Sequence, residues 1–233
     1  MINFHLISGA RARSIILGTL MGMLLLSLFT SQSARSGHAD APIAATADEI
    51  QPLAAGEAAP AFVIRSVDGD TVSFDPRSLE RPAVIVTFRG GWCPFCNMHL
   101  SELRHVLPEI NELGVDVLFL SGDRPDQLYA SLSGETQEDI AGLGYTIYSD
   151  ADANAALALG IAFRSSDRTL QRRHEKGQDV AGSSMSKHSV LPVPAVFAVG
   201  ADGVIAFAYA NPDYKVRVPA DELLAVAREI TAP

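Results

Sequence analysis

Cysteine and tryptophan are almost absent from this chain of 233 residues, which contains two Cys and one Trp. With so few thiols, the chain is not one of the small secreted scaffolds that several disulfides hold together. The two cysteines, Cys93 and Cys96, are three positions apart, and the loop that they would close is too short to stabilise a fold much. Their use is therefore predicted to be chemical rather than structural.

Basic residues are also scarce, because 18 Lys and Arg stand against 27 Asp and Glu, which gives a formal net charge of −9. So acidic a protein is not expected to bind nucleic acid or anionic membrane surfaces. Contact with a membrane is expected only through residues 14–34, and only if that segment stays attached.

A long apolar run, Ile15 to Phe29, follows two arginines near the N-terminus and is followed by small and polar residues. This order is typical of a secretory signal peptide, with cleavage expected after Ser33 or Ala39. We therefore interpret residues 1–39 as a signal peptide. The alternative is an uncleaved anchor, because residues 14–34 approach the roughly 20 residues that span a bilayer. Either interpretation predicts a periplasmic or other extracytoplasmic location.

Removal of residues 1–39 leaves 194 residues, enough for one domain with a substantial core, and a formal charge of −12 because three arginines and no acid are removed. Residues 40–55 are rich in Ala and other small residues and are expected to be a linker. The domain itself is predicted to comprise residues 56–233.

Apolar patterns along the domain predict strands that alternate with helices. An N-terminal β-hairpin is expected around Asp68-Gly69-Asp70, and a helix kinked at Pro108 is expected after the cysteines. The pattern further indicates buried strands over 82–88 and 115–121, helices over 125–132, 151–160 and 219–230, and a hairpin that joins 195–200 to 204–210.

Residues 164–189 interrupt this rhythm, since they are polar, mildly basic and rich in Ser and Gly. They are predicted to be an insertion on the surface, which either guides a partner or only fills surface. Taken together, the elements predict an α/β sandwich in which helices flank a central mixed β-sheet.

The two cysteines stand where the buried strand 82–88 gives way to a helix. Pro94 is favoured at the first position of a helix, because its missing N–H is no loss there. Unpaired N–H groups and the positive end of the helix dipole then face Cys93, which favours its thiolate. Cys96 lies one turn further on. The arrangement predicts that Cys93 attacks a disulfide and that Cys96 resolves the mixed disulfide.

Neighbouring residues are expected to support the thiols, and no metal or cofactor is predicted. Trp92 is expected to shield the pair and to offer a flat contact to a partner, and Arg89 to add positive charge. Zinc needs about four ligands, and only His99 continues the spacing, on a helix face where a solvated histidine is expected. Haem attachment needs His directly after the second Cys, where Asn97 stands. Turns and caps are the expected roles of Asp123, Asp150 and Asp202.

From about residue 56 to the end, the chain resembles the thioredoxin-fold superfamily, and within it the peroxiredoxin-like alkyl hydroperoxide reductase/thiol-specific antioxidant branch that carries C-x-x-C. The segments that carry this resemblance are VTFRGGWCPFC, YSDADANAALALGIAFR, LPVPAVFAVGADGVIAFAYANPDY and ELLAVA. The resemblance implies a thioredoxin-like sandwich. It also implies a cis-proline that precedes a late strand and faces the disulfide, and Val193-Pro194 matches that position. Val193 and Pro194 are therefore expected to contact a bound partner.

The chain departs from the peroxiredoxin pattern P-x-x-x-T-x-x-C, whose Thr acts with a distant Arg on the peroxide. Aligned without gaps, the peroxiredoxin Pro falls on Arg89, the Thr on Cys93, the reactive Cys on Cys96 and the Arg on Pro194. Loss of both activating residues removes the donors that would stabilise the developing negative charge. The departure disfavours a peroxidase.

These observations lead to three hypotheses. The first is an exported thiol–disulfide oxidoreductase that cycles Cys93 and Cys96 between dithiol and disulfide, acting on protein or small-molecule disulfides with an external thiol reductant or oxidant. The alternative is a peroxiredoxin-type thiol peroxidase that reduces hydroperoxides. A minor alternative is a copper-binding assembly factor, which would combine the two cysteines with His188.

Overall fold

The computed structural model describes residues 43–232. The predicted signal peptide or anchor, residues 1–39, lies outside the described residues. Among the helices of the described part, none is both long and apolar enough to cross a membrane.

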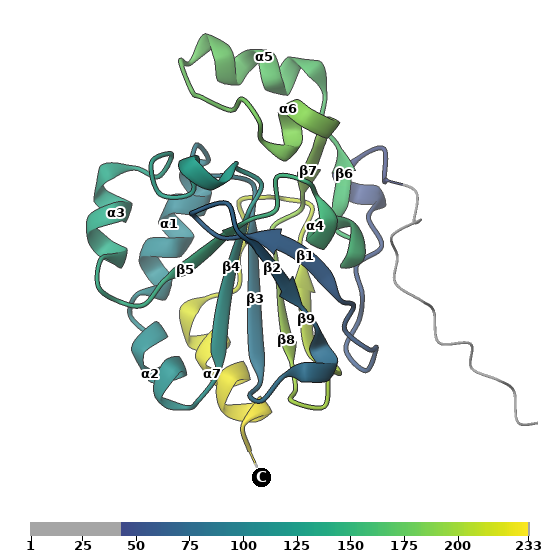
Figure 1. The fold of residues 1–233 in the computed structure, drawn as a ribbon, viewed down its shortest axis with the longest axis vertical. Coiled ribbons are helices and arrows are strands. Elements are labelled where there is room, and N and C mark those ends of the chain that lie inside the picture. The colour runs from purple at the N-terminus through teal and green to yellow at the C-terminus, as the bar shows by residue number, and fades with distance from the viewer. Residues whose placement is uncertain (1–42, 233) are drawn as a thin grey trace, which may run out of the picture. The chain divides into compact units, whose positions relative to one another are not determined.

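A seven-stranded mixed β-sheet forms the centre of the domain, in the order β2-β1-β5-β4-β3-β8-β9 (Figure 1). Strands β3, β4 and β5 run parallel to their neighbours in that group, whereas the other neighbouring pairs are antiparallel. The strands are β1 (Phe62–Arg65), β2 (Thr71–Phe74), β3 (Ala83–Phe88), β4 (Asp116–Ser121), β5 (Thr146–Ser149), β8 (Ala195–Val199) and β9 (Ile205–Ala210).

Helices flank this sheet, which confirms the predicted fold class (Figure 1). Helix α1 packs against α3, and α2 packs against α7. The flanking helices are α1 (Pro94–Leu103), α2 (Leu107–Glu112), α3 (Gly134–Ile140), α4 (Asn154–Ala158) and α7 (Ala220–Ile230).

Both predicted hairpins are present, β1 with β2 and β8 with β9. Every residue of β3 is buried, as expected for a strand covered on both faces. Ile85 pairs with Leu118 of β4 on one side and with Phe197 of β8 on the other. This strand is the rigid support that delivers the chain to the two cysteines.

Two helix predictions are wrong. The helix after the cysteines is not kinked at Pro108 but interrupted: α1 ends at Leu103 and α2 begins at Leu107, which places Pro108 in a first turn, where proline is tolerated. Residues 125–132 form only a 3-10 turn, η4 (Pro125–Gln127), followed by further turns. These turns are held by contacts with other parts of the chain, since the Tyr129 hydroxyl donates to the carbonyl of Tyr145 and the backbone of Ser131 and Leu132 lies against Gly91.

The stretch predicted to be a linker contacts the domain over its described residues, 43–55. It contains a short 3-10 helix, η2 (Ala47–Glu49). Ala44 forms a bridge with Phe163, and the N–H of Leu53 donates to the carbonyl of Leu159 at 3.1 Å. The side chain of Leu53 is buried.

The predicted insertion, residues 164–189, rises from a two-stranded sheet formed by β6 (Ala162–Arg164) and β7 (Val190–Pro192). It contains α5 (Asp167–Glu175) and α6 (Ser184–His188), which lie beyond one end of the central sheet (Figure 1). Helix α5 buries no residue and fits the prediction of a polar surface segment. The second half differs, because Val180 and Met185 are buried in the core.

Candidate active site

Two glycines carry the chain from β3 to the cysteines through a crowded space. A Cβ atom on Gly90 would lie 2.4 Å from Trp92 Nε1 and 2.7 Å from Asp123 Oδ1, and one on Gly91 would lie 2.2 Å from Ser131 Oγ. The N–H of Gly91 donates to Asp123 Oδ2 at 2.8 Å. A side chain at either glycine would therefore push the loop away from the segment that follows β4.

Cys93 occupies the N-terminal cap of α1, and Pro94 stands at its first position, as predicted. The N–H groups of Cys96 and Asn97 both donate to the carbonyl of Cys93, at 3.0 and 3.1 Å. Both cysteines are free thiols, and their exposed fractions are only 2% and 1%. The thiols thus lie one turn apart beneath the surface.

The two thiols have very different acidities. A hydrogen bond from the Cys96 thiol, with the Cys96 backbone N–H and the positive charges of Arg217 and Arg89, lowers the pKa of Cys93 to about 6, although burial opposes the shift. Burial raises the pKa of Cys96 well above its ordinary value, and the hydrogen bond to Cys93 and the Cys93 charge act in the same direction. Near neutral pH the pair therefore holds one thiolate, on Cys93, and one thiol, on Cys96.

Two arginines direct positive charge at the thiols. The Nη2 atom of Arg217 lies 3.5 Å from Cys96 Sγ. The guanidinium of Arg89 lies 4.3 Å from the centre of the Tyr214 ring and 5.6 Å from that of Phe163. Within residues 43–232 neither arginine forms an ion pair with a carboxylate. Their charge is therefore available to a thiolate. The positive charge predicted for Arg89 is present, whereas Arg217, 121 positions from Cys96, could not be anticipated.

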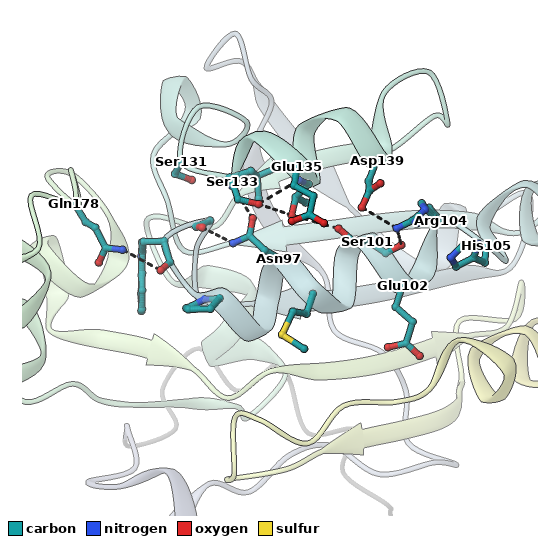
Figure 2. Close-up of a pocket in the computed structure, with 16 residues that line it drawn as sticks. Asn97, Ser101, Glu102, Arg104, His105, Ser131, Ser133, Glu135, Asp139 and Gln178 are labelled. Carbon is teal, nitrogen blue, oxygen red and sulfur yellow. Dashed lines mark hydrogen bonds and ion pairs between the residues drawn. The ribbon is translucent and has the colours of Figure 1, made fainter.

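Asn97 fixes the turn formed by residues 91–96, which we call the cysteine turn. In the sequence, this residue is notable only because haem attachment would need a histidine in its place. Its amide donates to the carbonyls of Gly91 and Cys93 at 2.6 and 3.0 Å, and its oxygen accepts from the N–H of Ser133 at 2.8 Å. Asn97 also lines a cavity of about 820 Å³ between α1 and α3, where Arg104, the C-terminal cap of α1, donates to Asp139 of α3 at 2.7 Å (Figure 2). Its position four residues after Cys93, on the same helix face, was the available signal.

Trp92 is buried beneath the insertion and has an exposed fraction of 9%. The guanidinium of Arg173 in α5 lies 4.9 Å from the centre of its ring, and the amide of Gln178 donates to its carbonyl at 3.2 Å. Arg173 also donates to Gln178 at 3.2 Å. The ring of Trp92 is thus covered by Arg173, and its predicted roles of shielding the thiols and contacting a partner stay predictions.

Arg124, which follows β4, ties the insertion to the sheet. It donates two hydrogen bonds to the carboxylate of Asp179, at 3.1 and 2.8 Å, and one to the carbonyl of Ala181. The N–H of Ser184 donates to the carbonyl of Gly122 at 2.9 Å. These contacts hold the insertion over Trp92 and the cysteine turn.

The predicted cis peptide at Val193-Pro194 is wrong, because no peptide bond among residues 43–232 is cis. The trans form is the more stable one even before proline, by about 0.5–1 kcal/mol. The N–H of Val193 donates to the carbonyl of Ile161 at 2.8 Å and is therefore not available to a partner strand, and the Val193 carbonyl accepts from Thr87 at 3.4 Å. Pro194 is buried, and it lines a small cavity together with Arg217. Because Arg217 also contacts Cys96, this shared cavity places Pro194 near the thiols.

The side chain of His99 is buried, so the prediction of a solvated histidine is wrong. Its Nε2 atom lies 3.1 Å from the carbonyl of Val218, and burial, with the nearby charge of Arg217, lowers its pKa to about 4. The ring is neutral at physiological pH and serves as packing between α1 and the segment before α7.

The three aspartates make the turn and cap contacts expected of them. Asp123 holds Gly91 and Ser131. Asp150 accepts from the N–H groups of Ala155 and Ala156, both at 2.9 Å, at the start of α4. Asp202 accepts from the N–H of Val204 in the β8–β9 turn.

His188, the residue on which a copper site would depend, lies at the end of α6. Its Nε2 atom is 3.9 Å from Asp152, and about two fifths of its side chain is exposed. Across residues 43–232, no group of three or more His, Cys, Asp and Glu side chains is placed to hold a metal ion.

Several proteins of known type are similar to this chain. ResA, a thiol-disulfide oxidoreductase of Halalkalibacterium halodurans, is 29% identical over 107 residues, which cover 46% of this chain and 57% of ResA. Peroxiredoxin Bcp of Escherichia coli is 29% identical over 112 residues, which cover 48% of this chain and 67% of Bcp. The chain thus spans little more than half to two thirds of the length of these relatives.

Solved structures share the fold at low identity. A peroxiredoxin-like protein from Aquifex aeolicus superposes with a TM-score of 0.52 at 18% identity, covering 77% of this chain and 89% of its own. Peroxiredoxin 6 of Arenicola marina gives a TM-score of 0.56 at 19% identity, covering 75% and 72%. The family model described as the AhpC/TSA family matches residues 55–208. This match includes the cysteine pair and most of the central sheet, and the chain therefore belongs to the AhpC/TSA family.

Proposed function

We propose that this protein is an exported thiol–disulfide oxidoreductase that cycles Cys93 and Cys96 between dithiol and disulfide. The observation that carries the proposal is the divergent acidity of two thiols one helical turn apart, with the pKa of Cys93 lowered to about 6 and that of Cys96 raised. A reactive thiolate beside a protonated resolving thiol is what disulfide exchange requires. Family membership and the names of both groups of relatives support a thiol-dependent oxidoreductase.

The exchange proceeds in two steps that conserve sulfur and electrons. The Cys93 thiolate attacks one sulfur of the substrate disulfide, whose S–S bond breaks as the other sulfur leaves as a thiolate and takes up a proton. Cys96 then loses its proton and attacks the Cys93 sulfur of the mixed disulfide. The second substrate thiol is released, and the substrate has gained two electrons. An external thiol reductant regenerates the dithiol, and a thiol oxidant would drive the cycle in reverse.

Arg217 and Asn97 support these steps by holding charge and geometry. The guanidinium of Arg217, 3.5 Å from Cys96 Sγ, stabilises the anion that forms on Cys96 in the second step. Asn97 donates to the carbonyls of Gly91 and Cys93 and so keeps the cysteine turn in place while the disulfide bonds of Cys93 form and break.

The test measures reduction of a small protein disulfide by the wild type and by single variants. Cys93→Ser should abolish turnover, whereas Cys96→Ser should attack once and accumulate a mixed disulfide that mass spectrometry detects. Met98→Ser, at an exposed position of the same helix, is the control and should keep wild-type turnover. Retained turnover in Cys93→Ser would contradict the proposal.

A thiol peroxidase is the second candidate, favoured by the AhpC/TSA match and by the guanidinium of Arg217 beside Cys96, which forms no ion pair with a carboxylate within residues 43–232. A thiolate would attack one peroxide oxygen, the O–O bond would break to release water or an alcohol, and the sulfenic acid would condense with the other thiol, releasing water. The threonine of the peroxiredoxin pattern is replaced by Cys93. Peroxide consumption much faster than that of an ordinary thiolate of equal pKa would place this activity first.

Export is part of the proposal and is supported by the order of residues 1–39. The full chain, expressed in a bacterial host, should be recovered from the periplasm with a mass that lacks residues 1–33 or 1–39. Recovery of the uncut chain with membranes would favour the anchor, and recovery from the cytoplasm would contradict export.

A further inference from the structure

Helix α5 of the insertion carries a row of exposed basic side chains. Arg168, Arg172 and Lys176 follow one another at intervals of four, which places them on one face across α5 and its C-terminal cap. All three are exposed, and within residues 43–232 none forms an ion pair. We call these three residues the basic row.

The insertion is positively charged on a protein that is otherwise acidic. Residues 164–189 hold six Lys and Arg against three Asp and Glu, whereas the whole chain has a net charge of −9. One of the three acids is already paired with a cation outside the segment, since Asp179 accepts from Arg124. The basic residues of the segment therefore outweigh its acids, and the potential around the basic row is positive.

The basic row belongs to the segment that covers Trp92, the residue before Cys93. Arg173, the residue after Arg172, places its guanidinium 4.9 Å from the ring of Trp92, which directly precedes Cys93. Gln178, two residues beyond Lys176, donates to the Trp92 carbonyl. A partner held by the basic row is thus held on the segment whose Arg173 and Gln178 contact Trp92.

The chemistry of α5 fits an acidic polypeptide better than a membrane. Membrane-binding helices place large apolar side chains opposite their basic face. The only large apolar residue of α5, Leu170, packs against the core, and no large apolar side chain of residues 164–189 is exposed. A polar helix without such anchors binds through charge alone.

We propose that the basic row recruits acidic polypeptides that carry a disulfide, and so selects the substrates of the Cys93–Cys96 pair. This inference rests on the proposed function, because it names the substrate class for the same site. Complementary charge at the edge of an interface raises the association rate and is weakened by salt.

The test compares two synthetic peptides with the same disulfide, one flanked by Asp and Glu and the other by Lys. Arg168→Gln/Arg172→Gln/Lys176→Gln removes the basic row. The matched control, Arg77→Gln/Arg81→Gln/Arg228→Gln, removes the same charge at exposed positions that line no described cavity at the thiols. Wild type should favour the acidic peptide about tenfold in kcat/KM at low salt. Loss of the basic row should abolish the preference, while the control triple keeps it.

A small neutral disulfide, bis(2-hydroxyethyl) disulfide, separates this inference from the proposed function. All three proteins should reduce it equally. If none reduces it, the proposed function fails. If all reduce it but wild type treats both peptides alike, or both triple variants lose the preference equally, the basic row does not select substrates. Binding of the wild type, but not of the variant lacking the basic row, to vesicles of anionic lipid without any peptide preference would overturn the proposal in favour of a membrane surface.

Discussion

The central sheet and helix α5 of the insertion are built in opposite ways. Strand β3 buries all six of its residues between β4 and β8. Helix α5 of the insertion buries none, and it is held over the site by Arg173 on Trp92 and by Arg124 on Asp179. Apolar burial supplies most folding free energy, whereas exposed ion pairs contribute about 0–1 kcal/mol each.

This contrast assigns different tasks to the two regions. The sheet fixes where the thiols lie, because β3 and the glycine pair deliver Cys93 to the start of α1. The insertion covers Trp92, the residue before Cys93, through contacts that are individually weak. Segments with few buried apolar contacts open at low free-energy cost. Mutations at the surface are therefore expected to leave the position of the thiols unchanged. Mutations in the insertion are expected to change how easily a reagent reaches them.

The largest expected effect tests the sheet against the insertion directly. Phe197→Ala removes a fully buried ring from β8 and should lower the free energy of unfolding by about 3–5 kcal/mol. Leu170→Ala removes a partly buried side chain from α5 and should cost about 1 kcal/mol or less. Urea unfolding measures both values. Equal losses would mean that the insertion is as integral to the fold as the sheet.

The next effect concerns the thiolate that the sheet positions. Because the pKa of Cys93 is lowered to about 6, its alkylation by iodoacetamide should reach half of its plateau rate near pH 6. An ordinary thiol, with a pKa of about 8.5, would react about 300 times more slowly than its plateau at that pH. Cys96→Ala removes the hydrogen bond that lowers the Cys93 pKa most, and should move the midpoint upward. A wild-type midpoint near 8.5 would contradict the assignment.

The same lowered pKa makes stability depend on pH. Between about pH 6 and pH 8.5 the unfolded chain holds a proton on Cys93 that the folded chain has lost. The free energy of unfolding should therefore rise with pH in this window, and this contribution should vanish as the pH falls through about 6. In Cys93→Ser the rise should be absent.

A smaller effect is expected from Arg217, which contributes positive charge at the thiols. Arg217→Gln removes a positive charge beside the thiols and should raise the pKa of Cys93, slowing alkylation near pH 6 about two- to fourfold. Arg217→Lys keeps the charge and is the control. If both variants slow alkylation alike, the role of Arg217 lies in packing and not in charge.

The smallest expected effect sharpens the role of the insertion. Arg173→Ala removes the guanidinium that covers Trp92 and should speed alkylation of Cys93 about two- to threefold at a fixed pH. Arg172, at the preceding position of the same helix, makes no such contact with Trp92 within residues 43–232, and Arg172→Ala should leave the rate unchanged. Equal rates in wild type and both variants would show that the insertion does not limit access to Cys93.

Local patterns predicted much of this protein. The hairpin at Asp68-Gly69-Asp70 and the buried strand at 82–88 follow from turn chemistry and apolar runs, and both are present. Pro94 after Cys93 predicted the start of α1. Each of these signals spans only a few neighbouring residues, because it depends on backbone preferences and on which side chains avoid water. The misses at 125–132 and His99 arose where contacts distant in the sequence overrode such preferences.

By itself, the sequence determined that two thiols stand one turn apart where a buried strand meets a helix, since that placement needs only local propensity. The same local signals indicated that Cys93 is the more acidic thiol, whereas the tertiary structure decided how deeply both thiols lie and which charges surround them. Arg217 reaches Cys96 across 121 positions, and Arg173 covers Trp92 across 81. Such contacts depend on how the whole chain folds back on itself, because charge and burial act through space and not along the chain.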